Sequence, residues 1–160
     1  MMLKKNRNSL TNKVKYKIVN HFIKNGNKTT CENILSKSLK LIQKSQKKSH
    51  KEIMKLALLN STPTFRLIEL KEKRKKKRKK GTANSKQIPA FLSHYTFRFS
   101  WALKFMVEGL KKQSKTSKFS ESLHQEIVAS SQNIGESVKL KTAIQKQVLK
   151  RKFYFKYYRW

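Results

Sequence analysis

Histidine, cysteine and acidic side chains could carry catalysis or hold a metal ion, and they are few and scattered in this sequence. Cys31 is the only cysteine, whereas a structural zinc site needs about four clustered ligands. All eight acidic residues are Glu, so the usual Ser-His-Asp triad cannot form, although Glu can replace Asp in it. The histidines lack the H-x-x-x-H or H-E-x-x-H spacing, and they are His21, His50, His94 and His124. We therefore expect no enzyme, no metal site and no cofactor.

Lysine and arginine are the abundant functional side chains, and they indicate a polyanionic partner. The chain has 40 Lys and Arg residues against eight acids, a formal charge of +32. The densest run is KEKRKKKRKK at residues 71–80. Such runs are often solvated or act as nuclear-localisation signals, but this one lies in mid-chain between two apolar segments. That position favours an arm that meets phosphates, where release of counterions makes binding steeply dependent on salt.

Apolar residues at intervals of three and four predict six amphipathic helices that position these cations. The first helix is expected to end at Gly26, a favourable residue just past a helix C-terminus. Thr29 and Ser49 each precede a Glu by three residues, which is the spacing of a capping box at a helix start. We expect Ser137 to cap the last helix. The apolar patterns fall at residues 10–25, 31–42, 53–58, 97–110, 119–128 and 140–149. No uninterrupted apolar run approaches the roughly 20 residues that a membrane span needs, so no membrane contact is expected.

The hydrophobic period changes to two between the third and fourth helices. Phe65 and Leu67 alternate with Arg66 and Ile68, and QIPAFL at residues 87–92 is again strand-like. Pro89 places that segment at an edge or a strand end. Two short strands joined by the basic run indicate a long hairpin. The predicted fold class is mainly α: a six-helix single domain (residues 1–160) with a projecting β-hairpin between helices three and four. The subdivisions are a basic N-terminal arm (1–9), a β-ribbon with a basic tip (64–92) and an aromatic, basic tail (153–160).

Two further groups of cations are candidate contacts for RNA. One group follows the fourth helix and consists of Lys111, Lys112, Lys115 and Lys118. The other lies in the terminal sequence KRKFYFKYYRW, where cations alternate with aromatic rings that can stack on bases. Its members are Arg151, Lys152, Lys156, Arg159 and Trp160. By contrast, we expect the aromatic stripe of Phe97, Trp101 and Phe105 to lie in the core.

Four stretches resemble protein seven of the small ribosomal subunit. GNKTTCENIL at residues 26–35 is similar to the family's GKKSTAESIV-type stretch, QIPAFL resembles its returning strand, and FRFSWALKFMVEGL at 97–110 resembles its fourth helix. The terminal FKYYRW is similar to the family's FAHYRW. The order of three helices, a ribbon and three helices is also similar, and the resemblance covers about residues 10–160.

The resemblance implies a structural protein that binds small-subunit rRNA in the 3′ major domain and helps to assemble the head. It would lie near the mRNA exit channel and the exit-site tRNA, beside neighbouring head proteins, and no homo-oligomer is expected. The family's Arg-rich start of helix four is reduced here to Arg98. The family's rRNA contacts carry over to Lys4, Lys5, Arg7, Lys13, Lys15, Lys17, Lys28, Lys73, Arg74, Lys75, Lys76, Lys77, Arg78, Lys79 and Lys80.

Composition and the N-terminus bear on the cellular compartment. The chain is rich in Lys, Asn, Ile and Phe and poor in Gly and Ala, which is typical of AT-rich coding sequences. Its start, MMLKKNRNSL, lacks the apolar segment of a secretory signal and is poor in Arg for an organelle presequence. We expect an organelle-encoded protein of the mitochondrial ribosome, with a plastid or bacterial cytoplasm as alternatives. The alternative function is a free-standing basic protein that compacts nucleic acid or regulates it.

Overall fold

The computed structural model describes residues 14–23, 25–46, 49–71, 85–113 and 118–156. A first helix occupies residues 14–22. The elements that follow are α2 (Lys28–Ser45), α3 (His50–Ser61), β1 (Phe65–Lys71), β2 (Ser85–Phe91), α4 (Tyr95–Gln113), α5 (Phe119–Ser131), α6 (Glu136–Lys150) and a terminal 3₁₀ helix, η1 (Lys152–Lys156). The predicted fold class is confirmed, because six helices carry one antiparallel hairpin between α3 and α4.

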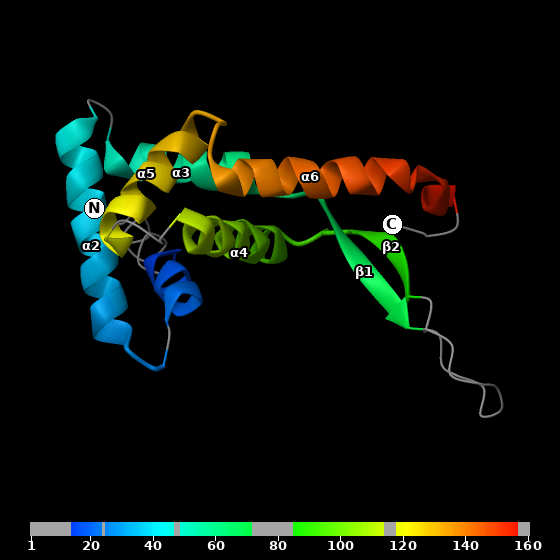
Figure 1. The fold of residues 1–160 in the computed structure, drawn as a ribbon, viewed down its shortest axis with the longest axis horizontal. Coiled ribbons are helices and arrows are strands. Elements are labelled where there is room, and N and C mark those ends of the chain that lie inside the picture. The colour runs from blue at the N-terminus through cyan, green and yellow to red at the C-terminus, as the bar shows by residue number, and fades with distance from the viewer. Residues whose placement is uncertain (1–13, 24, 47–48, 72–84, 114–117, 157–160) are drawn as a thin grey trace, which may run out of the picture.

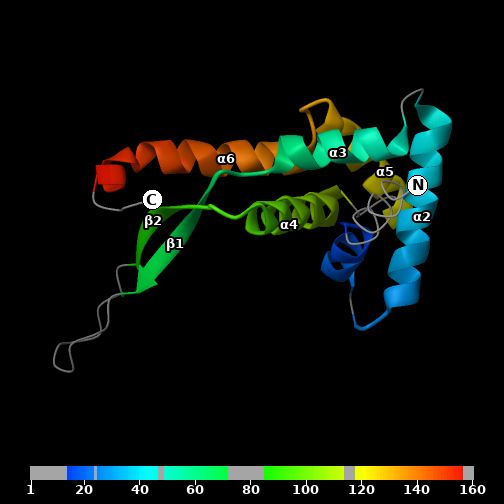
Figure 2. The same ribbon diagram turned by 180° about the vertical axis from the view of Figure 1, so that it is seen from behind.

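The helices form an elongated body with the hairpin at one end. In Figure 1, α3, α4 and α6 run along the long axis, and α2 crosses that direction at the end far from the hairpin. Figure 2 shows from behind that α6 and α3 follow one another along the long axis, and the two β-strands lead away from the helices. The helix α6 contacts β1 and η1 contacts β2, so the last described residues lie against the hairpin.

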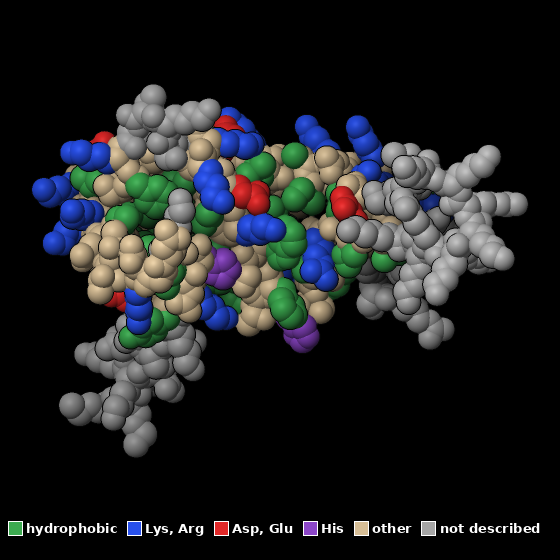
Figure 3. Space-filling model, turned by 60° about the horizontal axis from the view of Figure 1, so that its bottom comes forward, with side chains coloured by type: hydrophobic (Ala, Val, Ile, Leu, Met, Phe, Trp, Pro, Cys, Tyr) green, Lys and Arg blue, Asp and Glu red, His purple; other side chains and the backbone are tan. Residues whose placement is uncertain are grey.

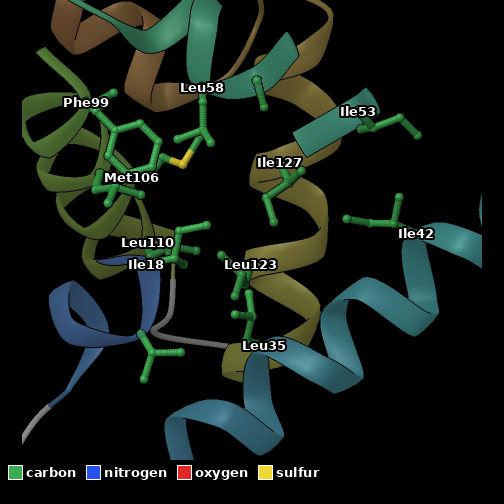
Figure 4. Close-up of a cluster of buried hydrophobic side chains, with 14 residues drawn as sticks. Ile18, Leu35, Ile42, Ile53, Leu58, Phe99, Met106, Leu110, Leu123 and Ile127 are labelled. Atoms are coloured by element: carbon green, nitrogen blue, oxygen red, sulfur yellow. The ribbon is translucent and has the colours of Figure 1, made fainter. Parts of the chain in front are cut away.

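The hydrophobic core lies where α5 packs between α2, α3 and α4. Side chains at helical spacing on each of these elements point into one cluster, as Figure 4 shows. The helix at residues 14–22 packs on one side of the cluster. An isolated helix of this length would be only marginally stable, so this packing stabilises it. The labelled members are Ile18, Leu35, Ile42, Ile53, Leu58, Phe99, Met106, Leu110, Leu123 and Ile127.

The residues that the sequence predicted to start or end helices agree only in part with the structure. Gly26 has φ +76°, in the left-handed region, but the first helix ends at residue 22, so the prediction that it ends at Gly26 is wrong. Ser49 stands at the N-cap of α3, as predicted, but its side chain makes no capping hydrogen bond, so the predicted capping box is not formed. Thr29 lies inside α2, whose N-cap is Asn27, and Ser137 lies inside α6, whose N-cap is Gly135, so both of those predictions are wrong. Sequence spacing identified the helices but not the residue at which each one starts.

One buried carboxylate replaces the missing cap of α6. The Oε1 atom of Glu126 on α5 accepts a hydrogen bond from the Ser137 amide at 2.8 Å, and its Oε2 atom accepts one from the Glu136 amide at 3.2 Å. Its Oε1 also accepts the hydroxyl of Ser130 at 3.0 Å. A negative charge at a helix N-terminus interacts favourably with the exposed amides and the helix dipole. Gly135 permits this approach, because a Cβ there would lie 2.2 Å from the Ser130 hydroxyl oxygen.

Candidate nucleic-acid interface

The corner between the first helix and α2 presents exposed lysines. Lys15 and Lys17 are exposed on the helix at residues 14–22, and Lys28 is exposed at the first residue of α2. The Lys28 Nζ lies over the ring of Tyr16, 5.4 Å from its centroid, and that ring is 53% exposed. A cation over an aromatic face keeps its charge at the surface with fewer available rotamers. This corner can therefore offer an ordered ammonium group to a phosphate.

The described strands of the hairpin flank the segment predicted to be its basic tip. Its register pairs Phe65 with Phe91 at the base and Lys71 with Ser85 at the outer end. The tip, residues 72–84, lies outside the described residues, as do the candidate contacts of the N-terminal arm up to Lys13. The described strands run away from the helices, so the chain leaves the body at Lys71 and returns at Ser85 (Figure 1).

Two arginines predicted to meet RNA also make contacts with the hairpin. Arg98 Nε donates to the carbonyl oxygen of Leu92 at 2.5 Å, and its guanidinium carbon lies 5.1 Å from the centroid of the Phe91 ring. Arg151 Nη2 donates to Oε1 of Gln87 on β2 at 3.0 Å. Both arginines are half-buried. Each one joins the hairpin to a helix, which is a positioning role that the sequence did not reveal.

The C-terminal candidates are divided between the surface and the hairpin. Lys152 and Lys156 are exposed on η1, whereas the ring of Phe155 stacks on Phe65 of β1 with centroids 5.3 Å apart. Arg159 and Trp160 lie beyond the described residues. The aromatic tail thus begins by packing on the protein, and its exposed lysines remain available to a partner.

The candidates after the fourth helix lie near one helix end. Lys111 and Lys112 are exposed in the last turn of α4, where positive charge interacts favourably with the helix dipole. Lys118 is exposed at the N-cap of α5, and Lys115 lies outside the described residues. This end of α4 therefore adds an exposed cationic surface to the one at the N-terminal corner.

Several glutamates form a salt bridge or hydrogen bonds within the protein. The excess of positive charge therefore remains at the surface. Glu136 forms a salt bridge with Lys139 at 2.6 Å, and Glu69 Oε1 accepts a hydrogen bond from Gln87 at 3.1 Å. The bond and charge of Glu136 raise the pKa of Lys139 above its ordinary value. Burial instead lowers the pKa of Lys141, whose Nζ donates to the Asn60 carbonyl at 2.7 Å. Figure 3 shows many blue cations and few red acids on one face of the molecule.

Sequence reasoning misplaced one aromatic residue and missed one buried acid. Phe105 is buried as predicted, and Trp101 is half-buried, but Phe97 is 58% exposed, so its assignment to the core is wrong. The stripe through Phe99, Met106 and Leu110 faces the core instead. Both stripes have helical spacing, so the sequence alone did not distinguish them. Glu126 was a usable signal, because it interrupts the apolar pattern between Leu123 and Ile127.

Two further patterns concern the described residues, a cluster of metal ligands and a membrane-spanning helix. Within the ranges that the structure covers, no three His, Cys, Asp or Glu side chains gather closely enough to hold a metal ion. No helix among the same residues is long and apolar enough to cross a membrane.

A family model and two known proteins that match this chain all carry the description of one ribosomal protein. Residues 2–152 match the family described as Ribosomal protein S7p/S5e. The chain is 32% identical over 130 residues to the "Small ribosomal subunit protein uS7c" of Euglena gracilis, which covers 81% of this chain and 76% of that protein. It is 31% identical over 128 residues to the protein of the same name from Euglena longa, covering 80% of this chain and 66% of that one.

These relatives correct the expected compartment. Their names carry the suffix c, which denotes a chloroplast-type protein, and so they point to a plastid rather than a mitochondrion. The expectation of a mitochondrial ribosome is wrong. It rested on an AT-rich composition, which biases codon choice in the same way in either organelle genome and therefore cannot distinguish between them.

The family match covers nearly the whole chain, including every described α-helix and both strands. Its members are structural proteins of the small ribosomal subunit and not enzymes. That role agrees with the basic surface and the helical body described above. The chain belongs to the ribosomal protein S7p/S5e family.

Proposed function

We propose that this chain binds the 3′ major domain of small-subunit rRNA and helps to assemble the head of the subunit. In that position it lies beside neighbouring head proteins and near the mRNA exit channel and the exit-site tRNA. The observation that carries the proposal is the formal charge of +32, together with the burial of Glu126 and the pairing of Glu136 with Lys139. Such a surface needs a polyanion, and rRNA is the polyanion of the particle in which this family works.

The proposed contact surface combines three groups of exposed lysines around one rigid body. The first group surrounds the corner between the first helix and α2, the second lies at the end of α4, and the third lies on η1 beside the hairpin. The residues are Lys15, Lys17, Lys28, Lys111, Lys112, Lys118, Lys152 and Lys156. The basic run at residues 73–80, the N-terminal arm and the C-terminal residues beyond 156 complete the proposed surface.

Phosphate contact explains the affinity, and the shape of the RNA explains the specificity. Each phosphate that a lysine neutralises releases a condensed counterion, so affinity falls steeply as salt rises. Lysine is a compact point charge and does not read base edges in A-form RNA, whose deep major groove excludes side chains. Recognition then depends on how well the spacing of the three lysine groups matches the phosphates of one folded RNA.

The test is salt-dependent binding of the full chain to an rRNA fragment that spans the 3′ major domain. Replacing Lys73–Lys80 by Ser is expected to leave the helical circular dichroism intact and to reduce both the affinity and its salt slope, by several units for a run of phosphate contacts. The control variant keeps the composition of residues 73–80 but shuffles its order, and it should bind like the wild type. Loss of helical signal in the Ser variant would contradict the proposed projecting arm.

Fractionation in cells tests assembly separately from affinity. We expect the chain to migrate with small subunits on sucrose gradients after a high-salt wash. A soluble or chromatin-bound pool that never migrates with subunits would instead support the free-standing nucleic-acid-compacting protein. Crosslinking to rRNA in intact particles, with the peptides identified, would then place each lysine group.

A further inference from the structure

The outer face of α4 carries an aromatic strip that the core does not use. We define the strip as His94, Phe97 and Trp101, which follow one another at intervals of three and four residues along one side of the helix. The opposite side of α4 provides the buried residues Phe99 and Met106. His94 and Phe97 are exposed, the latter by 58%, and Trp101 is half-buried. Large exposed rings in a row are unusual on a surface with so much charge.

Ring contacts hold the strip in order. The rings of His94 and Phe97 meet edge to face with centroids 5.9 Å apart, and Trp101 packs on the buried Phe105 with centroids 5.7 Å apart. The Nζ atom of Lys104 lies over the ring of Trp101, 4.7 Å from its centroid. Lys104 is two turns beyond Phe97, which corresponds to roughly 10 Å along the helix. A flat exposed ring and an ordered cation therefore lie on one face.

This face is open in the described structure. Figure 1 shows α6 and α3 on one side of α4, and Figure 3 looks from the other side. There, hydrophobic, cationic and histidine side chains lie next to one another at the surface. Glu108 is the only acid on α4, whereas Lys104, Lys111 and Lys112 are exposed on it. The charge around the strip therefore favours a polyanion.

We propose that the aromatic strip is a stacking site for an unpaired RNA base, with Phe97 as the stacking ring and Lys104 on a neighbouring phosphate. The inference deepens the proposed function and rests on it, because it assigns one contact to bases rather than to phosphates. Single-stranded RNA is commonly recognised when splayed bases stack on aromatic side chains. Stacking on an aromatic ring tolerates any base, so the site fixes the position of an unpaired nucleotide without reading its identity.

The experiment compares a single-stranded oligoadenylate of 12 nucleotides with an abasic oligomer of the same length and charge. The full chain is expected to bind the base-bearing strand about tenfold more tightly, which is within the range for one stacked base. Phe97→Ala should abolish that preference and leave the salt slope unchanged, because no cation is lost. Phe97→Trp should retain it. Tyr95→Ala is the matched control, since Tyr95 is 66% exposed in the same turn but packs towards Phe99 at 6.2 Å.

A second readout locates the contact directly. Zero-length ultraviolet crosslinking to the same oligoadenylate, followed by trypsin digestion, should attach a nucleotide to the peptide of residues 87–98, at Phe97. A crosslink at Tyr95 or Phe91 in place of Phe97 would overturn the assignment. So would an unchanged base preference in Phe97→Ala, or an equal loss in Tyr95→Ala.

The outcomes separate this inference from the function on which it rests. If the wild type binds the rRNA fragment with a steep salt slope but shows no base preference, the stacking site is wrong and the phosphate-binding function stands. If neither RNA is bound, both fail. If Phe97→Ala keeps its base preference but no longer enters small subunits, the strip contacts a protein and the stacking proposal is overturned.

Discussion

The ring of Phe155, in the last described turn of the chain, stacks on the ring of Phe65 at the start of β1, with centroids 5.3 Å apart and planes inclined by 29°. Phe65 also meets Phe91 of β2 at 5.5 Å. Residues 90 positions apart are thus joined at the base of the hairpin. The arm that extends towards the basic run is therefore braced by the C-terminal segment as well as by its own strand pairing.

Phe155→Ala is expected to loosen the hairpin without unfolding the helices. A stacked aromatic pair contributes about 1 kcal/mol, so amide exchange in β1 and β2 should accelerate about fivefold. Exchange in the core helices α4 and α5 should not change. Phe153→Ala is the control, because Phe153 is exposed on the same 3₁₀ helix. Equal acceleration in both variants, or none in either, would show that Phe155 does not brace the strands.

Arg151 should act on RNA binding through the hairpin. Its Nη2 bond to Gln87 is continued by the Gln87 bond to Glu69, so one chain of contacts crosses from α6 to both strands. Arg151→Lys keeps the charge but loses the planar fork, and we expect faster amide exchange in the strands and an unchanged salt slope. A direct phosphate contact would instead be largely retained in Arg151→Lys and would lower the slope by about one in Arg151→Ala.

A double-mutant cycle checks the same contact independently. If Arg151 acts through Gln87, then Arg151→Lys and Gln87→Ala will not be additive in strand exchange, with a coupling of about 0.5 to 1.5 kcal/mol. Additive effects would show that this hydrogen bond does not contribute to the stability of the strands in solution.

Glu126→Gln is expected to destabilise the whole domain. The side chain is fully buried and accepts the amides of Glu136 and Ser137 and the hydroxyl of Ser130. An amide of the same size presents N–H groups where acceptors are needed, at a cost of about 1 to 3 kcal/mol in the free energy of unfolding. Urea unfolding followed by circular dichroism measures it. Glu121→Gln, an exposed acid on the same helix, should change little, and a similar loss in both would refute the role of the buried carboxylate.

Two lysines on α6 should give opposite pH dependences of stability. Burial lowers the pKa of Lys141, so the unfolded chain binds more protons there, and the free energy of unfolding should rise as pH approaches 10.5 from below. Glu136 raises the pKa of Lys139, so its contribution is complete below 10.5 and is lost as pH rises above that value. Urea unfolding is measured at several pH values for the wild type, Lys141→Gln and Lys139→Gln. Subtracting each variant's profile from that of the wild type gives the contribution of that lysine to the free energy of unfolding. Difference curves of the same sign would contradict these environments.

The sequence by itself determined the six helices, the hairpin between the third and fourth, and the demand for a polyanion. Those features follow from local periodicity and net charge, which need no knowledge of which elements meet. Gly26 has the positive φ that its residue type favours, which is a local property, but the first helix ends four residues before it. The motifs that resemble the ribosomal family were also local, and they identified it.

Only the tertiary structure decided what individual side chains do within that frame. Arg98 and Arg151 looked like other surface cations until the hairpin was placed against α4 and α6. The sequence predicted Phe97 in the core, but in the folded chain the stripe through Phe99 is buried and Phe97 is exposed. Glu126 caps α6 only because α5 packs against the start of that helix. Periodicity fixes which residues share a face of a helix, but contacts between distant segments fix whether that face is covered, and those contacts depend on the packing of the whole chain.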